Sequence, residues 1–204
     1  MKKIKNLLLV VFALVGMQSA YSQASVGIGV KGGLNFANVN VSQSAGQNYD
    51  NRTGYHFGAY TLFKFGKIGI QPEVLFSKQG AKGVSVNTGD FEQNYNYINI
   101  PVLLKLYTVA GINLQVGPQL GFLTAADVKQ TFNGVTTTND AKSITKNNDF
   151  SIAMGLGWDL PFGLSIDARY NLGITDINNS GSGPSAKNQV FQVSAGYRLF
   201  KLGK

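Results

Sequence analysis

Residues 163–175, with the sequence GLSIDARYNLGIT, alternate strictly between apolar and polar side chains. Leu164 and Ile166 begin the apolar series, and Ser165 and Asp167 begin the polar one. A period of two residues predicts a β-strand with one apolar and one polar face. At about 3.3 Å per residue the stretch would reach roughly 40 Å, and a tilted strand needs only ~9–11 residues to cross a bilayer.

Further segments repeat this alternation, which gives eight predicted strands: 25–39, 54–65, 67–78, 91–107, 112–123, 149–160, 163–174 and 188–200. Short connections alternate along the series with long polar ones: 40–53, 79–90, 124–148 and 175–187. This asymmetry is typical of membrane barrels. We therefore expect an all-β fold, an eight-stranded antiparallel up-and-down transmembrane β-barrel with short periplasmic turns and long external loops. A soluble β-sandwich, the alternative, usually has shorter alternating runs.

The polar parity of the strands carries charged residues that we assign to the barrel lumen: Lys31, Lys64, Glu73, Lys105, Asp159, Asp167, Arg169 and Arg198. Buried ionisable groups are normally paired, so these residues predict a salt-bridged network that fills the lumen. The interior of an eight-stranded barrel is just filled by its side chains. An open pore that prefers anions is the alternative, because the cations outnumber the carboxylates.

Aromatic side chains on the apolar parity fall near the predicted strand ends, where interface girdles of membrane barrels lie. The loop-end set is Tyr55, Phe57, Phe76, Phe122 and Phe150, and the turn-end set is Phe63, Phe65 and Trp158. This placement predicts that the apolar face contacts outer-membrane lipid.

The N-terminus reads as a secretory signal peptide over 1–22, followed by one barrel domain over 23–204. Three lysines precede an apolar run of nine residues, and Ala20-Tyr21-Ser22 has the small-x-small pattern of a cleavage site. The chain has no cysteine, which excludes disulfides, thiol chemistry and a cysteine-linked lipid anchor.

Several phrases occur in a characteristic order: 26–33, Gln71-Pro72-Glu73, 97–101, Gly117-Pro118-Gln119 and Gly196-Tyr197-Arg198. Together they resemble the PorT-like outer-membrane β-barrel domain family of Gram-negative bacteria, over essentially the whole mature chain. The resemblance implies a small barrel in the cell outer membrane, and some relatives are linked to protein secretion across that membrane. One departure is the C-terminus, where the chain continues past Phe200 instead of ending on an aromatic residue.

Three prolines, Pro72, Pro101 and Pro118, fall on consecutive predicted strands at a similar distance from the periplasmic turns. We place all three on the lipid-facing parity. Because proline removes a donor from the ladder of backbone hydrogen bonds, we expect a shared kink of the barrel wall at mid-depth.

His56 is the single histidine, and a two-residue turn at Gly66-Lys67 would place it opposite Ser77. A serine beside a histidine can act as nucleophile and base, but no carboxylate is evident to orient the ring. We therefore expect no enzyme, and a lipid-modifying enzyme is the least favoured function. One histidine and no cysteine predict no metal site, and we expect no cofactor.

The longest connection, 124–148, contains a hairpin signal: two short alternating runs, 128–132 and 135–138, flank Asn133-Gly134. Its exposed edge could recruit a protein partner by strand addition, or it is simply a solvated extension. The formal net charge is +8, yet basic and acidic residues balance in the long loops, so nucleic acid is not an expected partner. We expect a monomer with a structural or interaction role, and as alternatives a narrow pore or a secretion accessory.

Overall fold

The computed structural model describes residues 24–41, 47–85, 89–132, 135–176 and 186–203. The predicted signal peptide lies outside these residues. The described chain forms strands and one short 3-10 helix: β1 Ala24–Val41, β2 Gln47–Phe65, β3 Ile68–Ser85, β4 Gly89–Tyr107, β5 Ile112–Phe132, β6 Val135–Asp140, η1 Lys142–Ile144, β7 Asn148–Asp159, β8 Leu164–Gly173 and β9 Ala186–Gly203. None of the helical residues within these ranges forms a segment long and apolar enough to cross a membrane.

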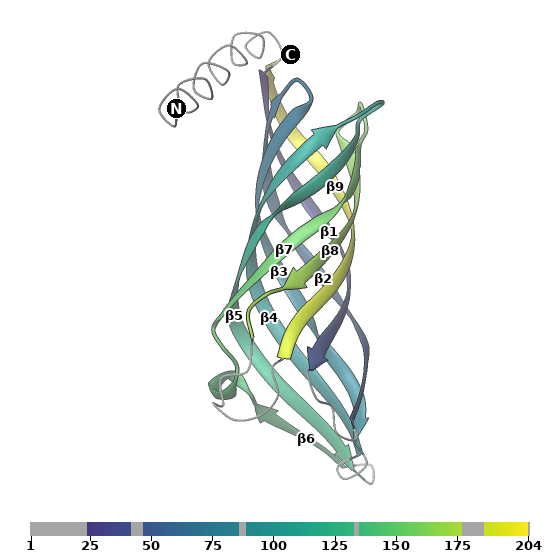
Figure 1. Cartoon of the computed structure of the whole chain (residues 1–204), viewed down its shortest axis with the longest axis vertical. Helices are drawn as coiled ribbons and strands as arrows, with labels where there is room; N and C mark the ends of the chain where they lie inside the picture. The colour runs from purple at the N-terminus through teal and green to yellow at the C-terminus, as the bar shows by residue number, and fades with distance from the viewer. Residues whose placement is uncertain (1–23, 42–46, 86–88, 133–134, 177–185, 204) are drawn as a thin grey trace, which may run out of the picture.

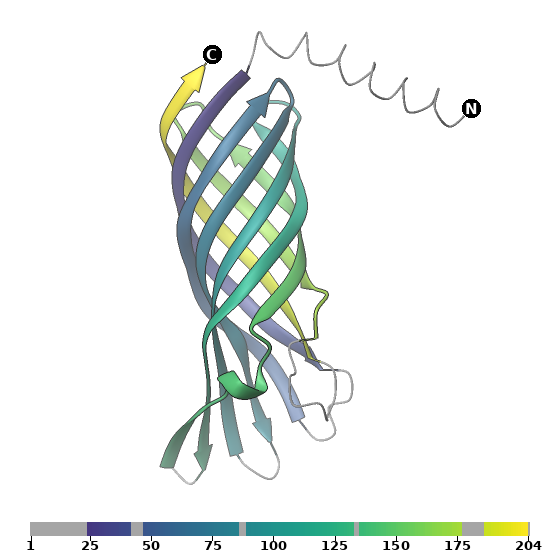
Figure 2. The same cartoon turned by 90° about the vertical axis from the view of Figure 1, so that its left-hand side faces the viewer.

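Eight of the strands close into a ring, with every neighbouring pair antiparallel (Figures 1 and 2). β1 pairs with β2 on one side and with β9 on the other, and the pairing of β4 with β5 completes the circle. β6 stands outside the ring, because it pairs with the far part of β5. The predicted eight-stranded up-and-down barrel is therefore confirmed.

The two ends of the barrel differ as the connection lengths predict. At one end, the turn end, β2 and β3 are joined by Gly66 and Lys67 alone, and Phe65 pairs with Ile68. Gly66 has a φ of +59°, a left-handed conformation that glycine adopts without steric cost. β1 begins and β9 ends at this same end of the barrel (Figure 1). The opposite end, the loop end, carries the longer extensions.

Exposure alternates along each strand, and the apolar side chains face outward. In β8, Ser165, Asp167 and Arg169 are buried inside the ring, whereas Ile166 and Tyr170 are exposed on its outer face. A soluble barrel would bury the apolar side chains and expose the polar ones. The inverted arrangement is that of a wall surrounded by lipid.

The predicted aromatic residues are on this outer face. Tyr55, Phe57 and Phe76 form one cluster across β2 and β3, with ring centroids 5.4 to 6.3 Å apart. At the turn end Trp158 is exposed on the outer face of β7, and its indole nitrogen donates to the carbonyl oxygen of Ala110. These positions suit rings that have an apolar body and lie at an interface.

The predicted loops 40–53 and 79–90 are wrong in their extent, because much of both is strand. β2 already begins at Gln47, β3 runs to Ser85, and β4 begins at Gly89. These ends carry few apolar side chains on either face, so they lack the alternation that marks a half-apolar strand. Their backbones are nevertheless paired: Ala81 lies opposite Asn51 on one side and Gln93 on the other.

The predicted hairpin in 124–148 is confirmed. β5 continues to Phe132 and β6 returns along it, with Phe132 opposite Val135, while the turn at 133–134 lies outside the described residues. A small apolar core supports this extension from inside, made of Ala81, Tyr95, Tyr97, Leu123, Ala126 and Ala141. The strands β2 to β6 thus project as one sheet beyond the ends of β7 and β8 (Figures 1 and 2).

Candidate functional site in the barrel lumen

Four charged side chains from three strands meet in the middle of the lumen. Lys31 of β1 places Nζ 3.3 Å from Oε1 of Glu73 and 3.0 Å from Oδ2 of Asp167. Arg169 of β8 binds Glu73 of β3 through two nitrogens, at 3.0 and 3.1 Å. All four residues are at most 4% exposed. Two cations balance two carboxylates, so this cluster, the central network, is neutral.

Amide side chains complete the central network. Gln71 donates to Oε1 of Glu73 at 2.8 Å. Gln115 of β5 donates to Asp167, and its own oxygen accepts a hydrogen bond from Arg169 at 3.1 Å. Charges removed from water are tolerated where such hydrogen bonds satisfy them. The amides therefore join β3, β5 and β8 across the full width of the lumen.

Gly157 provides the space that this packing requires. It lies on β7 opposite Asp167, on the face that points into the lumen. A Cβ atom at this position would lie 2.2 Å from Nε2 of Gln115 and 2.6 Å from Oδ1 of Asp167. The glycines interleaved with charges in the sequence thus make room for long side chains that arrive from neighbouring strands.

A second ion pair lies between the central network and the turn end. Nζ of Lys105 is 3.1 Å from Oδ1 of Asp159, and the hydroxyl of Tyr107 donates to the same carboxylate at 2.6 Å. Lys105 also donates to Gln71 at 3.1 Å, which connects the pair to Glu73. Six of the eight predicted lumen charges thus form one hydrogen-bonded chain.

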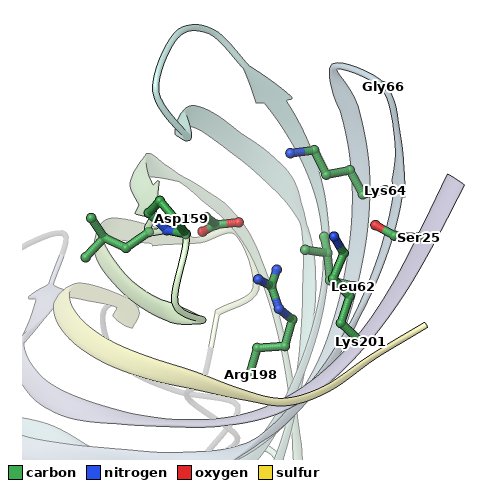
Figure 3. A pocket seen from close by; sticks show the side chains of 9 residues that line it. Ser25, Leu62, Lys64, Gly66, Asp159, Arg198 and Lys201 are labelled. Carbon is green, nitrogen blue, oxygen red and sulfur yellow. The ribbon is translucent and has the colours of Figure 1, made fainter. Parts of the chain in front are cut away.

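Lys64 and Arg198 do not join this chain. They line the mouth of the lumen at the turn end (Figure 3), and within the described residues neither forms a salt bridge. The ammonium of Lys64 instead lies 3.8 Å from the ring centroid of Tyr107. The surplus of cations over carboxylates that the sequence shows is therefore located at the mouth.

His56 lies opposite Ser77 in the β2–β3 register, as the two-residue turn predicts, but its hydrogen bonds go elsewhere. Nδ1 is 2.8 Å from Oδ1 of Asn35, and Nε2 is 2.8 Å from Oγ of Ser194. Because a carbonyl oxygen only accepts, Nδ1 is assigned the proton and Nε2 accepts from the serine hydroxyl. Asn35 also donates to Ser77 at 3.0 Å.

The chain Asn35–His56–Ser194 has the order of orienting group, base and nucleophile found in hydrolases. Here the three residues are at most 4% exposed, and none of them lines either of two cavities that lie near the turn-end mouth. Sequence reasoning missed Asn35 and Ser194. They belong to β1 and β9, whose contact depends on closure of the barrel and has no local signal.

The three prolines lie at one level of the wall, since Pro72 is opposite Val102 and Pro101 is opposite Gln119. Backbone pairing is interrupted beside each proline. The unpaired residues are 61–62 of β2 and 71–72 of β3, then 73–74 of β3 and 100–101 of β4, and finally 102–103 of β4 and 117–118 of β5. The register does not shift across these gaps, so they are missing pairs and not bulges. A kink of the wall at this level stays a prediction.

The placement of Pro101 on the lipid-facing parity is wrong. It is buried and points into the lumen, whereas the flanking Val102 is exposed on the outer face. Pro72 and Pro118 do lie on the outward parity. Because successive residues of a strand point to opposite faces, a proline beside two outward aliphatic residues must point inward.

No group of three or more histidine, cysteine or acidic side chains suited to hold a metal ion occurs among the residues that the structure describes. Most polar groups of the central network are instead hydrogen-bonded to one another, although Nε of Arg169 has no partner. These bonds join strands of the wall to one another. The accessible charged and polar side chains lie at the two ends of the barrel.

Solved structures that are similar to this barrel in fold include the following two. Neisserial surface protein A superposes with a TM-score of 0.56 at 9% identity, over 86% of this chain and 99% of its own. The attachment invasion locus protein Ail of Yersinia pestis superposes with a TM-score of 0.52 at 13% identity, over 87% and 99%. At these identities the likeness concerns the fold alone. No curated protein matches the sequence.

A family model described as outer membrane protein beta-barrel domain matches residues 18–179, most of the chain. The match agrees with the closed ring, the outward apolar face and the polar lumen. These features place the protein in the outer membrane, with the turn end toward the periplasm and the loop end outside the cell. The chain belongs to the outer membrane protein beta-barrel domain family.

Proposed function

We propose that this barrel does not conduct and acts as an interaction protein through the sheet at its loop end. The observation that carries the proposal is the length of β5. Its last pair with β7 joins Phe122 to Asn148, yet β5 continues to Phe132, ten residues further. At about 3.4 Å per residue this extension reaches roughly 34 Å beyond the closed ring. A wall needs no such projection to cross a bilayer.

The projecting sheet ends on β6, whose outer edge no described strand covers. The backbone nitrogen of Ala141 donates to the carbonyl oxygen of Ala126 at 3.0 Å. Since antiparallel pairs alternate between bonded and non-bonded, residues 135, 137 and 139 also bond to β5. The backbone groups of Thr136 and Thr138 therefore point outward, and the close approach of Thr136 Oγ1 to Thr131 Oγ1, 2.9 Å, agrees with a non-bonded pair. An extended segment of a partner protein can add to such an edge.

Proline substitutions separate this edge from the hairpin itself. Thr138→Pro removes an outward donor and leaves the β5–β6 bonds intact, whereas Thr137→Pro breaks the hairpin. In cells that express the protein with a photoreactive residue at position 136, strand addition predicts one defined cross-linked partner. That product should disappear in both variants and persist in Lys82→Gln, a charge change elsewhere on the projection. A product that survives Thr138→Pro would contradict strand addition.

The proposal that the lumen is closed rests on the central network, whose four charges are buried and paired. Single-channel recording on the refolded mature chain tests it, after heat-modifiable gel mobility has verified folding. We expect no discrete conductance steps. Reproducible conductance steps with anion selectivity would contradict the closed lumen and favour the alternative function, a narrow pore.

We further propose a PorT-like assignment, a monomeric state and the absence of enzymatic activity. The Tyr-x-x-Ile-Pro phrase at 97–101 supports the first, and the enclosure of His56 and Ser194 supports the last. A role as a secretion accessory would make the partner at β6 a component of that machinery, and mass spectrometry of the cross-linked product would identify it. The solvated-extension alternative predicts no product at all.

A further inference from the structure

The turn-end mouth of the lumen holds a cavity of about 400 Å³ (Figure 3). Lys64 of β2 and Arg198 and Lys201 of β9 line it, together with the hydroxyl of Ser25. In Figure 3 the side chains of Lys64 and Arg198 point into the space that Asp159 faces from the other side. Three cations and one carboxylate therefore surround the same volume.

The carboxylate is already engaged. Asp159 accepts hydrogen bonds from Lys105 at 3.1 Å and from Tyr107 at 2.6 Å, both from the inner side of the mouth. Lys64, Arg198 and Lys201, by contrast, form no salt bridge with any carboxylate among the described residues. Unpaired cations gathered around one cavity repel one another, and an anion between them relieves that repulsion.

The cavity narrows on its inner side. A narrower space continues from it past Tyr60 to Gln71, and Gln71 is hydrogen-bonded to Glu73 of the central network at 2.8 Å. The central network is neutral, so the excess positive charge is confined to the mouth. The mouth is therefore a basic vestibule that is open to the periplasm and lies outside the neutral central network.

We propose that this vestibule, made of Lys64, Arg198 and Lys201, binds a phosphate group that carries at least two negative charges. A guanidinium offers paired donors that match a phosphate, and lysines add point charges that fit a multivalent anion. At about 30 Å³ per water, the cavity has the volume of roughly 13 waters, enough for a phosphate and part of the molecule that bears it. The phosphate comes either from a soluble periplasmic molecule or from a headgroup of the inner leaflet. This inference goes beyond the proposed interaction at the loop end and does not depend on it.

The soluble source is tested with pyrophosphate on the refolded, ¹⁵N-labelled mature chain. Octyl glucoside is the suitable detergent, because it contains no phosphate, and chloride keeps the ionic strength constant. We expect saturable shifts of the amides of Ser25, Gly66 and the end of β9. Arg198→Gln should weaken binding at least tenfold. Lys67→Gln, which removes a charge at the same end but outside the cavity, should change it less than twofold.

The lipid source is tested in nanodiscs without added pyrophosphate. Replacing phosphatidylcholine by an anionic phosphomonoester lipid, phosphatidic acid, should shift the same amides, and Arg198→Gln should remove the effect. Lys64→Gln and Lys201→Gln provide independent variants if Arg198→Gln does not fold by gel mobility. Saturation in either arm, sensitive to the vestibule variants, supports the proposal and identifies the source. Failure of both arms, or equal losses in Lys67→Gln and Arg198→Gln, overturns it.

Discussion

His56 of β2 and Ser194 of β9 form a hydrogen bond across the intervening strand β1, with Nε2 and Oγ 2.8 Å apart. Gly33 of β1 is opposite both residues, and it has no side chain to separate them. The contact thus joins three neighbouring strands near the place where the first and last strands close the ring. The two atoms are arranged like the base and the nucleophile of a hydrolase. Both residues are buried, however, as expected for a hydrogen bond that stabilises the fold.

We expect His56→Ala to lower the free energy of unfolding by about 1–3 kcal/mol, because it leaves buried polar partners unsatisfied. The measurement is urea-dependent folding into phospholipid vesicles, followed by gel mobility and by the fluorescence of Trp158. The effect of Ser194→Ala should be coupled to that of His56→Ala. The double variant should therefore lose less free energy of unfolding than the sum of the losses in the two single variants.

The same two variants test the absence of enzymatic activity. Phospholipid composition should be unchanged when the wild-type protein is incubated with vesicles, and unchanged again with either variant. A lipid product made by the wild type and lost in both His56→Ala and Ser194→Ala would show that the buried arrangement opens and acts as a hydrolase.

Gly33→Ala should destabilise the barrel by about 1–3 kcal/mol through overpacking. A Cβ at this position would collide with the carbonyl oxygen of Val193 and would lie 2.7 Å from Cα of Ser194. Gly32→Ala is the matched control, since its Cβ would face outward with its nearest neighbour 3.4 Å away. Equal unfolding midpoints for the two variants would show that Gly33 has no such role.

Strict alternation was sufficient to predict which face of most strands meets lipid, because only one parity can be apolar in a wall with a polar interior. Gly66 and Lys67 were sufficient to predict the pairing of His56 with Ser77, since a two-residue turn sets the register of its hairpin. The misplacement of Pro101 was an error of parity that its neighbours Ile100 and Val102 already contradict.

Other features depend on the closed ring and have no local signal. Ser194 is 138 residues from His56 in the sequence, and their approach depends on the β1–β9 register, which shifts between Ile28 and Gly29. The loop-end parts of β2 and β3 escaped prediction because outside the bilayer neither of their faces has to be apolar. The identity of each ion pair likewise depends on which strands face one another across the lumen.

Amide exchange tests the kink at the level of the prolines. Pairing is interrupted at 61–62, 73–74 and 102–103, so we expect amides at these gaps to exchange faster than those elsewhere on the same strands. Proline lacks the donor that would close each gap. Uniformly strong protection along β3, β4 and β5 would show that the wall is continuous there.

Glu73→Gln should be the most damaging of these substitutions, because it removes the carboxylate shared by Lys31 and Arg169. Breaking a buried ion pair from one side typically costs about 3–5 kcal/mol, since the remaining cation is left without compensation. Urea-dependent folding into vesicles measures the loss. Glu92→Gln is the matched control: Glu92 pairs with Arg52 at 3.0 Å, but its side chain is 31% exposed, so we expect about 1 kcal/mol or less.

The double variant Glu73→Gln/Arg169→Gln separates charge from packing. If uncompensated charge causes the loss, removing one cation together with the carboxylate restores much of the stability, because Lys31 still has Asp167 at 3.0 Å. If lost packing were the cause, the double variant would be no more stable than Glu73→Gln alone. Conductance of the same variants then tests the link between the network and the proposed closure of the lumen. If the wild type does not conduct but a folded single variant does, these charges, and not the narrow ring by itself, close the barrel.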